Sequence, residues 1–319
     1  MTLWRDSLIA VAVLAVLLAL PHVWPSTALV DFVIRVAAYG LFATSLNLLV
    51  GYAGMVSFGH GMFFGLGAYA FGLCMQKLGT SIPIAFVLAL LVNAVVAVVV
   101  GAISIRLKEI YFSFITLALQ MLLYSLIIAW VPLTGGDQGL QGGIPRPAFL
   151  GIRLNQVGHL YAFSSVLLVV GLLVLRHIIE SPFGYTLRLI RDNTERATFL
   201  GINVFLVKLI AFVIAGVFAG VGGIIMALFV SGAYPEFSNW TTSGEGIFMV
   251  MLGGVSTFLG PVAGTILLLL LNDVVARHTE YQGLALGIVI LLVALGLRKG
   301  ATDFLADKLR GRRQAVASV

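Results

Sequence analysis

Charged residues are scarce in this sequence, and cysteine is almost missing from it. Lysine, arginine, aspartate and glutamate make up 10% of the 319 residues, and Cys74 is the single cysteine. A soluble globular domain carries roughly 25% charged residues, so this chain cannot cover its own surface with polar groups. One cysteine excludes an intrachain disulfide and argues against a cysteine metal site. The scarcity of charge therefore indicates an integral membrane protein.

Two further absences argue against an enzyme. No Gly-x-x-x-x-Gly-Lys-[Ser/Thr] sequence occurs, so the chain has no P-loop and is not expected to hydrolyse ATP by that route. Nor do the hydrophobic runs hold a His/Cys cluster or a carboxylate with an adjacent base. We therefore expect no cofactor or metal in this chain. The net charge of +6 is expected to lie at a membrane surface, and no nucleic acid is expected as a partner.

Long apolar runs are abundant, and hydrophobic residues make up 60% of the chain. A helix needs about 20 apolar residues to cross a hydrocarbon core of about 30 Å. Continuous runs of that length argue against the alternating pattern of a membrane barrel. The sequence predicts an all-α polytopic bundle of about ten transmembrane segments, with 55–75 and 244–258 as candidates for re-entrant segments and the first as an uncleaved helix rather than a signal peptide. The segments are 7–24, 29–50, 55–75, 82–105, 110–131, 159–178, 204–230, 244–258, 261–277 and 282–298.

Basic residues gather on one side of this topology. Four lie in the predicted outer segments: Lys77, Arg146, Arg153 and Arg277. Fourteen lie in the inner ones: Arg5, Arg106, Lys108, Arg176, Arg188, Arg191, Arg196, Lys208, Arg298, Lys299, Lys308, Arg310, Arg312 and Arg313. The positive-inside rule then predicts that both termini are cytoplasmic.

This orientation divides the chain into four parts. The N-terminal half of six spans, 1–178, contains an outer loop at 132–158. A cytoplasmic coupling loop at 179–203 separates it from the C-terminal half of four spans at 204–298. The remaining residues, 299–319, form a basic cytoplasmic tail that is expected to contact anionic lipid headgroups.

The most polar stretch is 188–196, where five of nine residues are charged. Each charge at mid-bilayer would cost about 2.5–3.5 kcal/mol, so this stretch is predicted to lie outside the lipid. Angular spacing predicts one amphipathic helix over 187–200, capped near Gly201. Its apolar face would hold Leu189, Ile190, Asn193, Ala197 and Leu200. Its charged face would hold Arg188, Arg191, Asp192, Glu195 and Arg196, with each acid paired to an arginine one turn away.

Two functions for this helix stay open on physical grounds. It can lie at the lipid surface with its arginines on phosphates, or it can dock on a cytosolic partner. Phe199 favours docking, because an aromatic side chain on the charged face is expected to be covered by another molecule.

Three stretches carry a family resemblance. Glu195-Arg196-Ala197 with Gly201 resembles the Glu-Ala-Ala-x-x-x-Gly loop of ABC importer permeases, with Arg196 in place of the first alanine. Residues 51–61 and 251–264 resemble two glycine-rich motifs of the branched-chain amino acid permeases, the LivH/LivM family, and in particular its LivM type. Ser256 replaces one glycine of the later motif. The likeness covers about 40–298, and its structural glycines are Gly51, Gly54, Gly59, Gly61, Gly253, Gly254, Gly260 and Gly264.

The resemblance implies a permease subunit of an ATP-driven importer for branched-chain amino acids in the bacterial inner membrane. It also implies a second, LivH-like permease, two cytosolic ABC ATPase subunits that hold ATP and magnesium, and a periplasmic amino-acid-binding protein. In that family the loop helix sits in a cleft of the ATPase. A permease for urea, short amides or aromatic acids is one alternative. A self-sufficient secondary transporter or channel is another, against which the near-absence of carboxylates in the spans counts.

Isolated polar residues within the spans have two possible roles. They can bond across helices or line a translocation pathway; the candidates are Asn47, Ser57, His60, Asn93, Thr116 and Gln120. Likewise, the glycines of 51–61 can serve close packing or form a broken, pathway-lining segment. Asp31 and Arg35 are four residues apart, which predicts an intrahelical ion pair. No special role is expected for Asn272 or Asp273.

Overall fold

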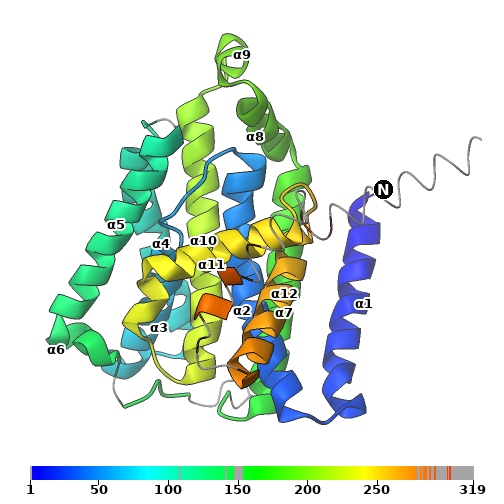
Figure 1. Cartoon of the computed structure of the whole chain (residues 1–319), viewed down its shortest axis with the longest axis vertical. Helices are drawn as coiled ribbons and strands as arrows, with labels where there is room; N and C mark the ends of the chain where they lie inside the picture. Colours follow the sequence, from blue (N-terminus) through cyan, green and yellow to red (C-terminus); the bar gives the residue numbers. More distant parts are fainter. Residues whose placement is uncertain are drawn as a thin grey trace, which may run out of the picture.

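The computed structural model describes residues 2–107, 109–140, 142–146, 154–278, 281, 283–285, 287, 288, 291, 300 and 302. The regular elements in this part of the chain are all helices (Figure 1). In order they are α1 (Thr2–Val23), α2 (Thr27–Asn47), the π-helix η1 (Leu48–Tyr52), α3 (Gly61–Lys77), α4 (Ile82–Ser104), α5 (Glu109–Ala129), α6 (Val131–Thr134), η2 (Gly136–Gln138), α7 (Val157–Glu180), α8 (Pro182–Asp192), α9 (Thr194–Phe199), α10 (Val204–Val230), η3 (Pro235–Ser238), α11 (Trp240–Gly253) and α12 (Gly260–His278).

Seven helices in the described residues are long and apolar enough to cross a membrane. They are Arg5–Val23, Thr27–Tyr52, Ile82–Ser104, Ile110–Ala129, Val157–Glu180, Val204–Val230 and Gly260–His278. They correspond to seven of the ten predicted segments, and the all-helical membrane fold is thereby confirmed. The last predicted segment, 282–298, lies mostly outside the described residues.

The other two predicted segments contain shorter helices. Residues 53–60 are non-helical, so α3 begins six residues later than predicted and has 17 residues. The helix α11 has 14 residues and ends at Gly253. At 1.5 Å per residue these helices are about 25 and 21 Å long, less than the hydrocarbon core of about 30 Å. The start of α3 and the end of α11 were missed because the non-helical residues next to them carry no charge and are mostly apolar or small, so the hydropathy of each segment stays high.

The centre of the bundle is built from α2 and α10 (Figure 1). On one side α10 packs against α3 and α4, and on the other side α2 packs against α7 and α12. Glycines let these helices approach closely: a Cβ on Gly67 would lie 2.4 Å from the Gly220 carbonyl oxygen. Rings fill the remaining space, with Phe42 and Phe64 at 5.2 Å between centroids. This rigid centre supports the more irregular elements around it.

Basic side chains are unequally divided between the two ends of the bundle. The helices α8 and α9 project at the end where α7 finishes, and the start of α1 lies at the same end (Figure 1). At this end Asp6 of α1 pairs with Arg176 of α7 at 2.9 Å. The described basic residues at this end are Arg5, Arg106, Arg176, Arg188, Arg191, Arg196 and Lys208. Those at the opposite end are Lys77, Arg146 and Arg277. The asymmetry predicted from the sequence is therefore present in the described part of the fold.

Candidate functional site

The charged stretch forms two helices instead of the single predicted helix over 187–200. The break is at Asn193, which has an extended backbone with φ −158° and ψ 100°. Its side-chain oxygen accepts a hydrogen bond from the Arg196 amide at 2.8 Å and so caps α9. Asparagine favours this capping geometry over the interior of a helix, and periodicity alone does not detect it.

The break changes which side chains are buried. Ile190 and Ala197 are fully buried and Leu189 is half-buried, as the predicted apolar face requires. Asn193 and Leu200, assigned to the same face, are exposed. The reason is that α9 starts a new direction after Asn193, so a single helical wheel does not describe both helices.

Two arginines of α8 hold the ends of two spans. The Arg191 guanidinium donates to the Gly51 carbonyl at 2.5 Å, at the end of the α2–η1 span. The Arg188 guanidinium donates to the Ile179 carbonyl at 3.1 Å, at the end of α7, and lies 5.3 Å from the Tyr52 ring centroid. The last carbonyls of a helix lack intrahelical donors and attract positive charge. These arginines therefore cap the helices on which α8 rests.

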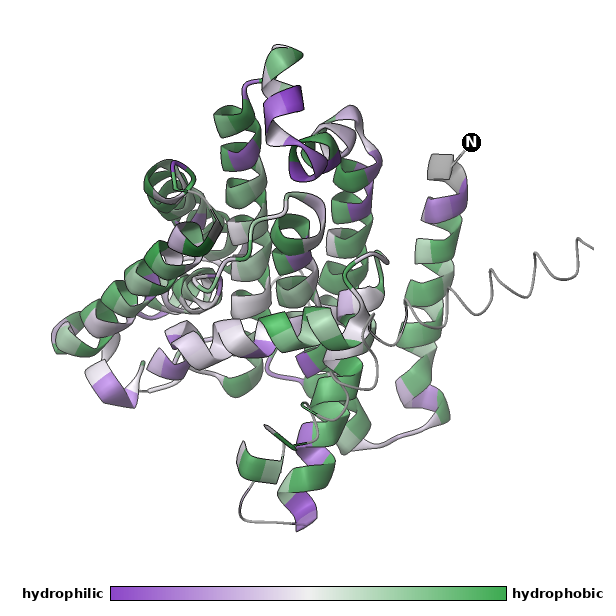
Figure 2. Ribbon diagram, turned by 45° about the horizontal axis from the view of Figure 1, so that its top comes forward, coloured by the Kyte–Doolittle hydropathy of each residue, from purple (hydrophilic) through white to green (hydrophobic). Residues whose placement is uncertain are grey.

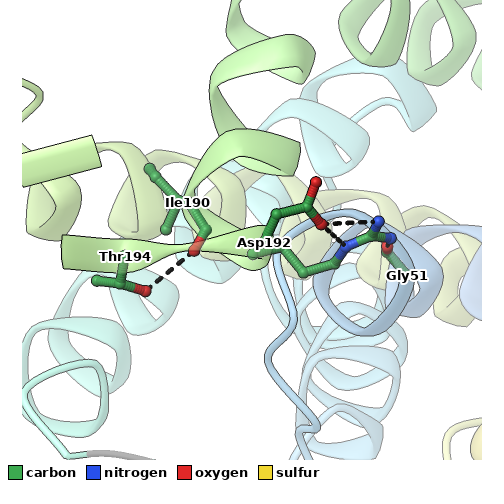
Figure 3. A network of polar contacts seen from close by, with 5 residues as sticks. Gly51, Ile190, Asp192 and Thr194 are labelled. Atoms are coloured by element: carbon green, nitrogen blue, oxygen red, sulfur yellow. Dashed lines mark hydrogen bonds and ion pairs between the residues drawn. The ribbon is translucent and has the colours of Figure 1, made fainter. Parts of the chain in front are cut away.

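The predicted acid–base pairs one turn apart are wrong for Asp192. Its carboxylate pairs with the adjacent Arg191 at 3.1 Å, beside the Gly51 contact (Figure 3). The Thr194 hydroxyl donates to the Ile190 carbonyl at 3.0 Å and bridges the break between α8 and α9. Glu195 is exposed on α9. The polar network thus fixes α8 to the membrane bundle and leaves the charges of α9 outside it.

Close approach of α8 to the bundle depends on Gly54. This residue has a φ of +69°, and a Cβ there would lie 2.8 Å from the Arg191 Cγ. A side chain at this position would be strained and would also push Arg191 away. Gly54 lies in the non-helical stretch 53–60, so α8 is in contact with the break that separates η1 from α3.

The tip formed by α9 projects beyond the other described helices at this end (Figure 1). The Phe199 side chain is 91% exposed and Leu200 is 65% exposed. Glu195 and Arg196 are exposed on the same short helix. The chain leaves the tip through Gly201, which has a φ of +80°. Two large apolar side chains between charged ones form a surface suited to a protein partner.

The six predicted pathway residues are all buried within this chain, each no more than 1% exposed. His60 Nε2 lies 2.9 Å from the Ser45 hydroxyl, and the Gln120 amide donates to the carbonyls of Ser238 and Asn239 at 3.0 and 2.6 Å. The remaining four form similar contacts: Asn47 to Val255, Ser57 to Gly59, Asn93 to Ala89 and Thr116 to Ser113. Each of the six therefore has a structural partner.

The start of α3 is joined to α11. The Gly61 amide donates to the Ser243 hydroxyl at 2.7 Å, and that hydroxyl donates to Gln120 at 2.7 Å. A Cβ on Gly59 would lie 2.4 Å from the Thr116 carbonyl oxygen. The early glycine motif thus packs a broken segment tightly against α5 and α11. Ser45 and Ser243, which complete these contacts, are isolated serines that sequence reasoning did not single out.

The later glycine motif joins α11 to α12. A Cβ on Gly253 would lie 1.8 Å from the Gly260 carbonyl oxygen, and one on Gly264 would lie 1.8 Å from the Met249 carbonyl oxygen. Gly254, with a φ of +118°, forms the turn after α11. These positions bring two backbones into direct contact, which only glycine permits.

Arg35 forms a different ion pair from the predicted one. Its two terminal nitrogens donate to the Asp273 carboxylate of α12 at 3.0 and 2.6 Å. The pairing with Asp31 is therefore wrong, and Asp273 has a role that was not expected. The four-residue spacing of Asp31 and Arg35 can be read from the sequence, whereas the contact between α2 and α12 that brings Asp273 to Arg35 cannot.

This pair gives a testable stability prediction. Asp273→Asn is expected to destabilise the protein by about 1–2 kcal/mol, because it leaves a partly buried arginine unpaired. Asp31→Asn, one turn from Arg35, is the matched control and should cost less. The loss of stability is measured by thermal unfolding in detergent of both aspartate variants. The same measurement on Arg35→Met, with and without Asp273→Asn, gives the coupling between the two residues. Equal effects of the two aspartate variants, or additive effects in the double variant, would contradict the pairing.

The comparisons with known proteins agree with this architecture. Residues 28–294 match the family model described as "Branched-chain amino acid transport system / permease component". The chain is 26% identical to the high-affinity branched-chain amino acid transport system permease protein LivM of Escherichia coli, over 95% of this chain and 77% of that protein.

The chain is also similar to other transport-system permeases. The autoinducer 2 import system permease protein LsrC of Salmonella typhimurium is 29% identical over 60% of this chain and 54% of its own length. The branched-chain permease LivH of the same organism is 22% identical over 83% and 91%. No solved structure matches the chain.

Proposed function

Because the chain belongs to the branched-chain amino acid transport permease family, we propose that it is the LivM-type permease of an ATP-driven importer for leucine, isoleucine and valine. The family consists of ABC transporter permeases, which are non-catalytic transmembrane subunits. In this proposal the chain forms the translocation pathway with a second, LivH-like permease. It binds no cofactor itself, and ATP and magnesium are held by two cytosolic ATPase subunits.

The observation that carries the proposal is the arrangement of α8 and α9. The exposed apolar tip of α9 offers a surface for the ATPase, and α8 is fixed to the bundle by Arg188 and Arg191. Movement of the tip would therefore reach the end of the α2–η1 span and the non-helical stretch 53–60. From there the contacts of Gly61 lead to α11. This is the connection that an alternating-access cycle driven by ATPase closure requires.

The distribution of charge supports a cytoplasmic position for the α8–α9 end. Seven of the described basic residues lie there, against three at the opposite end. Positive charge collects on the cytoplasmic side of membrane proteins. We count ten crossings in this proposal: the seven long helices, the regions of α3 and α11, and the segment 282–298. An even number of crossings places both termini on the same side, which is the cytoplasm. The opposite end faces the periplasm and the binding protein, and the tail 299–319 meets anionic lipid.

The choice of branched-chain amino acids rests on the LivM relatives. The LsrC relative serves autoinducer 2 import, so the permease family does not by itself fix the cargo. Cargo such as urea, short amides or aromatic acids remains the alternative within the same architecture, because the binding protein selects the ligand.

Reconstitution tests the proposed function. The chain, a second permease of the LivH type, the ATPase pair and the binding protein are placed in proteoliposomes, and uptake of labelled leucine is measured. We expect uptake only with internal ATP and with all components present. Uptake by this chain alone under an ion gradient would overturn the proposal in favour of a secondary transporter. ATP-driven uptake of a different ligand would replace the cargo and keep the class.

A further inference from the structure

The helix α11 exposes a polar surface where a membrane protein should be apolar. In Figure 2 the first half of α11 is paler than most of the neighbouring helical surface, which marks weak hydropathy. Thr241 is exposed, Glu245 is half-buried, and nothing would lie within 4 Å of a Cβ added to Gly244. The apolar Phe248 and Met251 follow on the exposed side, at 41% and 53%. The polar surface is therefore confined to the segment around Glu245.

This polar surface lies near the middle of the bundle in depth. A Cβ on Gly246 would lie 2.5 Å from the Phe42 ring and 3.2 Å from the Leu46 side chain. Phe42 is about 22 Å from the start of the Thr27–Tyr52 span and about 15 Å from its end, at 1.5 Å per residue. Glu245, the neighbour of Gly246, is thus close to the centre of the hydrocarbon core. An ionised carboxylate facing lipid there would be strongly unfavourable.

Glu245 has no cation within the described part of the chain. Its carboxylate makes no hydrogen bond or ion pair there, and its interaction is electrostatic, with the half-buried Tyr39. Tyr39 also interacts electrostatically with Arg35, whose guanidinium is already paired with Asp273. An ionised carboxylate at this depth needs a positive partner, and such a partner would come from outside these residues.

We propose that Glu245 binds the ammonium group of the substrate as it passes along α11. This rests on the proposed function, in which the cargo is a zwitterionic amino acid and this chain forms the pathway with a second permease. The exposed polar surface of α11 is the part of the chain that we assign to that pathway. The surface around the carboxylate suits such a ligand. Thr241 lies one turn before Glu245 and Phe248 nearly one turn after it, so a hydroxyl and an aromatic ring flank the charge. A ring beside the carboxylate also favours a cation.

The proposal differs from the roles assigned to the other polar residues. The six residues considered first for the pathway are buried and hydrogen-bonded inside this chain. Glu245 is half-buried and has no hydrogen bond or ion pair among the described residues. It lies two residues after Ser243, which accepts the hydrogen bond from the start of α3. Movement of the non-helical stretch 53–60 would therefore reach α11 through the Gly61–Ser243 hydrogen bond, two residues from Glu245.

The test uses the complete reconstituted importer with Glu245→Gln, which keeps size and removes charge, and Glu245→Asp, which keeps charge. Glu236→Gln, an exposed glutamate on η3, is the matched control. Three quantities are measured: leucine uptake, ATPase stimulation by the leucine-loaded binding protein, and copurification of the second permease. We expect Glu245→Gln to lower uptake at least tenfold while ATPase stimulation and copurification persist. Glu245→Asp should retain more uptake, and Glu236→Gln should match the wild type.

Two results would overturn the proposal. Normal uptake by Glu245→Gln would show that the carboxylate is not needed for passage. Loss of the second permease from the Glu245→Gln complex would show that the carboxylate pairs with a basic residue of that subunit instead. Failure of the proposed function is seen separately, because the wild-type importer would then take up no leucine.

Discussion

Gly264→Ala is expected to prevent stable folding of the C-terminal part of the protein. A Cβ at this position would lie 1.8 Å from the Met249 carbonyl oxygen and 2.6 Å from the Gly253 nitrogen, whereas ordinary contacts lie at 3.4–4 Å. Both neighbours are backbone atoms, so no side chain can turn away. The two helices would have to separate, and the contact between Gly253 and Gly260 would open with them. The expected cost is more than about 3 kcal/mol, above the usual range for an overpacked core.

The control is Gly244→Ala on the neighbouring helix α11, where nothing lies within 4 Å of the added Cβ. The yield of monodisperse protein in detergent and its unfolding temperature are compared with the wild type. Gly264→Ala should give little monodisperse protein, and Gly244→Ala should match the wild type in both quantities. A Gly264→Ala protein as stable as Gly244→Ala would mean that the backbones of α11 and α12 are not in contact.

Phe199→Asp is expected to detach the ATPase from the membrane complex. The side chain is 91% exposed at the tip of α9, where a partner is needed to cover it. Central aromatic residues of an interface often contribute about 2 kcal/mol or more, which corresponds to about thirty-fold in affinity. The added carboxylate would also be buried beside Glu195. Copurification of the ATPase and ATP-driven uptake should both be lost, while the amount of inserted permease stays unchanged.

Two further variants make this result specific. Leu78→Asp changes an apolar side chain that is 67% exposed at the opposite end of the bundle, and it should leave ATPase binding intact. Arg191→Ala should also keep the ATPase bound, because Arg191 faces the bundle, but it should lower uptake about tenfold by removing the Gly51 contact. Continued ATPase binding by Phe199→Asp would assign α9 to the lipid surface instead.

The sequence predicted the helical membrane class because apolar runs and scarce charge constrain it directly. It also placed the exposed charged tip, since five charges in nine residues cannot be inserted into lipid. The break at Asn193 was missed because helical periodicity continues through it, and only the capping side chain marks the end of α8. The late start of α3 was missed for the opposite reason: residues 53–60 are apolar enough to enter the membrane without forming a helix.

Contacts between distant elements were beyond sequence reasoning. The pairing of Arg35 with Asp273 requires knowing that α2 and α12 are neighbours, and the nearer Asp31 was the natural choice without that knowledge. Glu245 was overlooked within a predicted span because one carboxylate does not change the average hydropathy of the segment. Its importance depends on its exposure and on the lack of a cation among the residues that the structure describes, and both are seen only in the folded chain.

Mutations can remove the contact between Arg191 and residue 51 from one side only. The acceptor is a main-chain carbonyl, which every amino acid possesses, so no codon change at position 51 can delete it. A screen for mutants that consume ATP without transport would recover substitutions at Arg191. It would also recover substitutions at Gly54, because a side chain there would push against the Arg191 side chain. It could reach position 51 only through added bulk, since a Cβ there would lie 2.8 Å from the Val255 carbonyl oxygen. We therefore expect most substitutions that break this contact to lie at Arg191 and Gly54, and few at position 51.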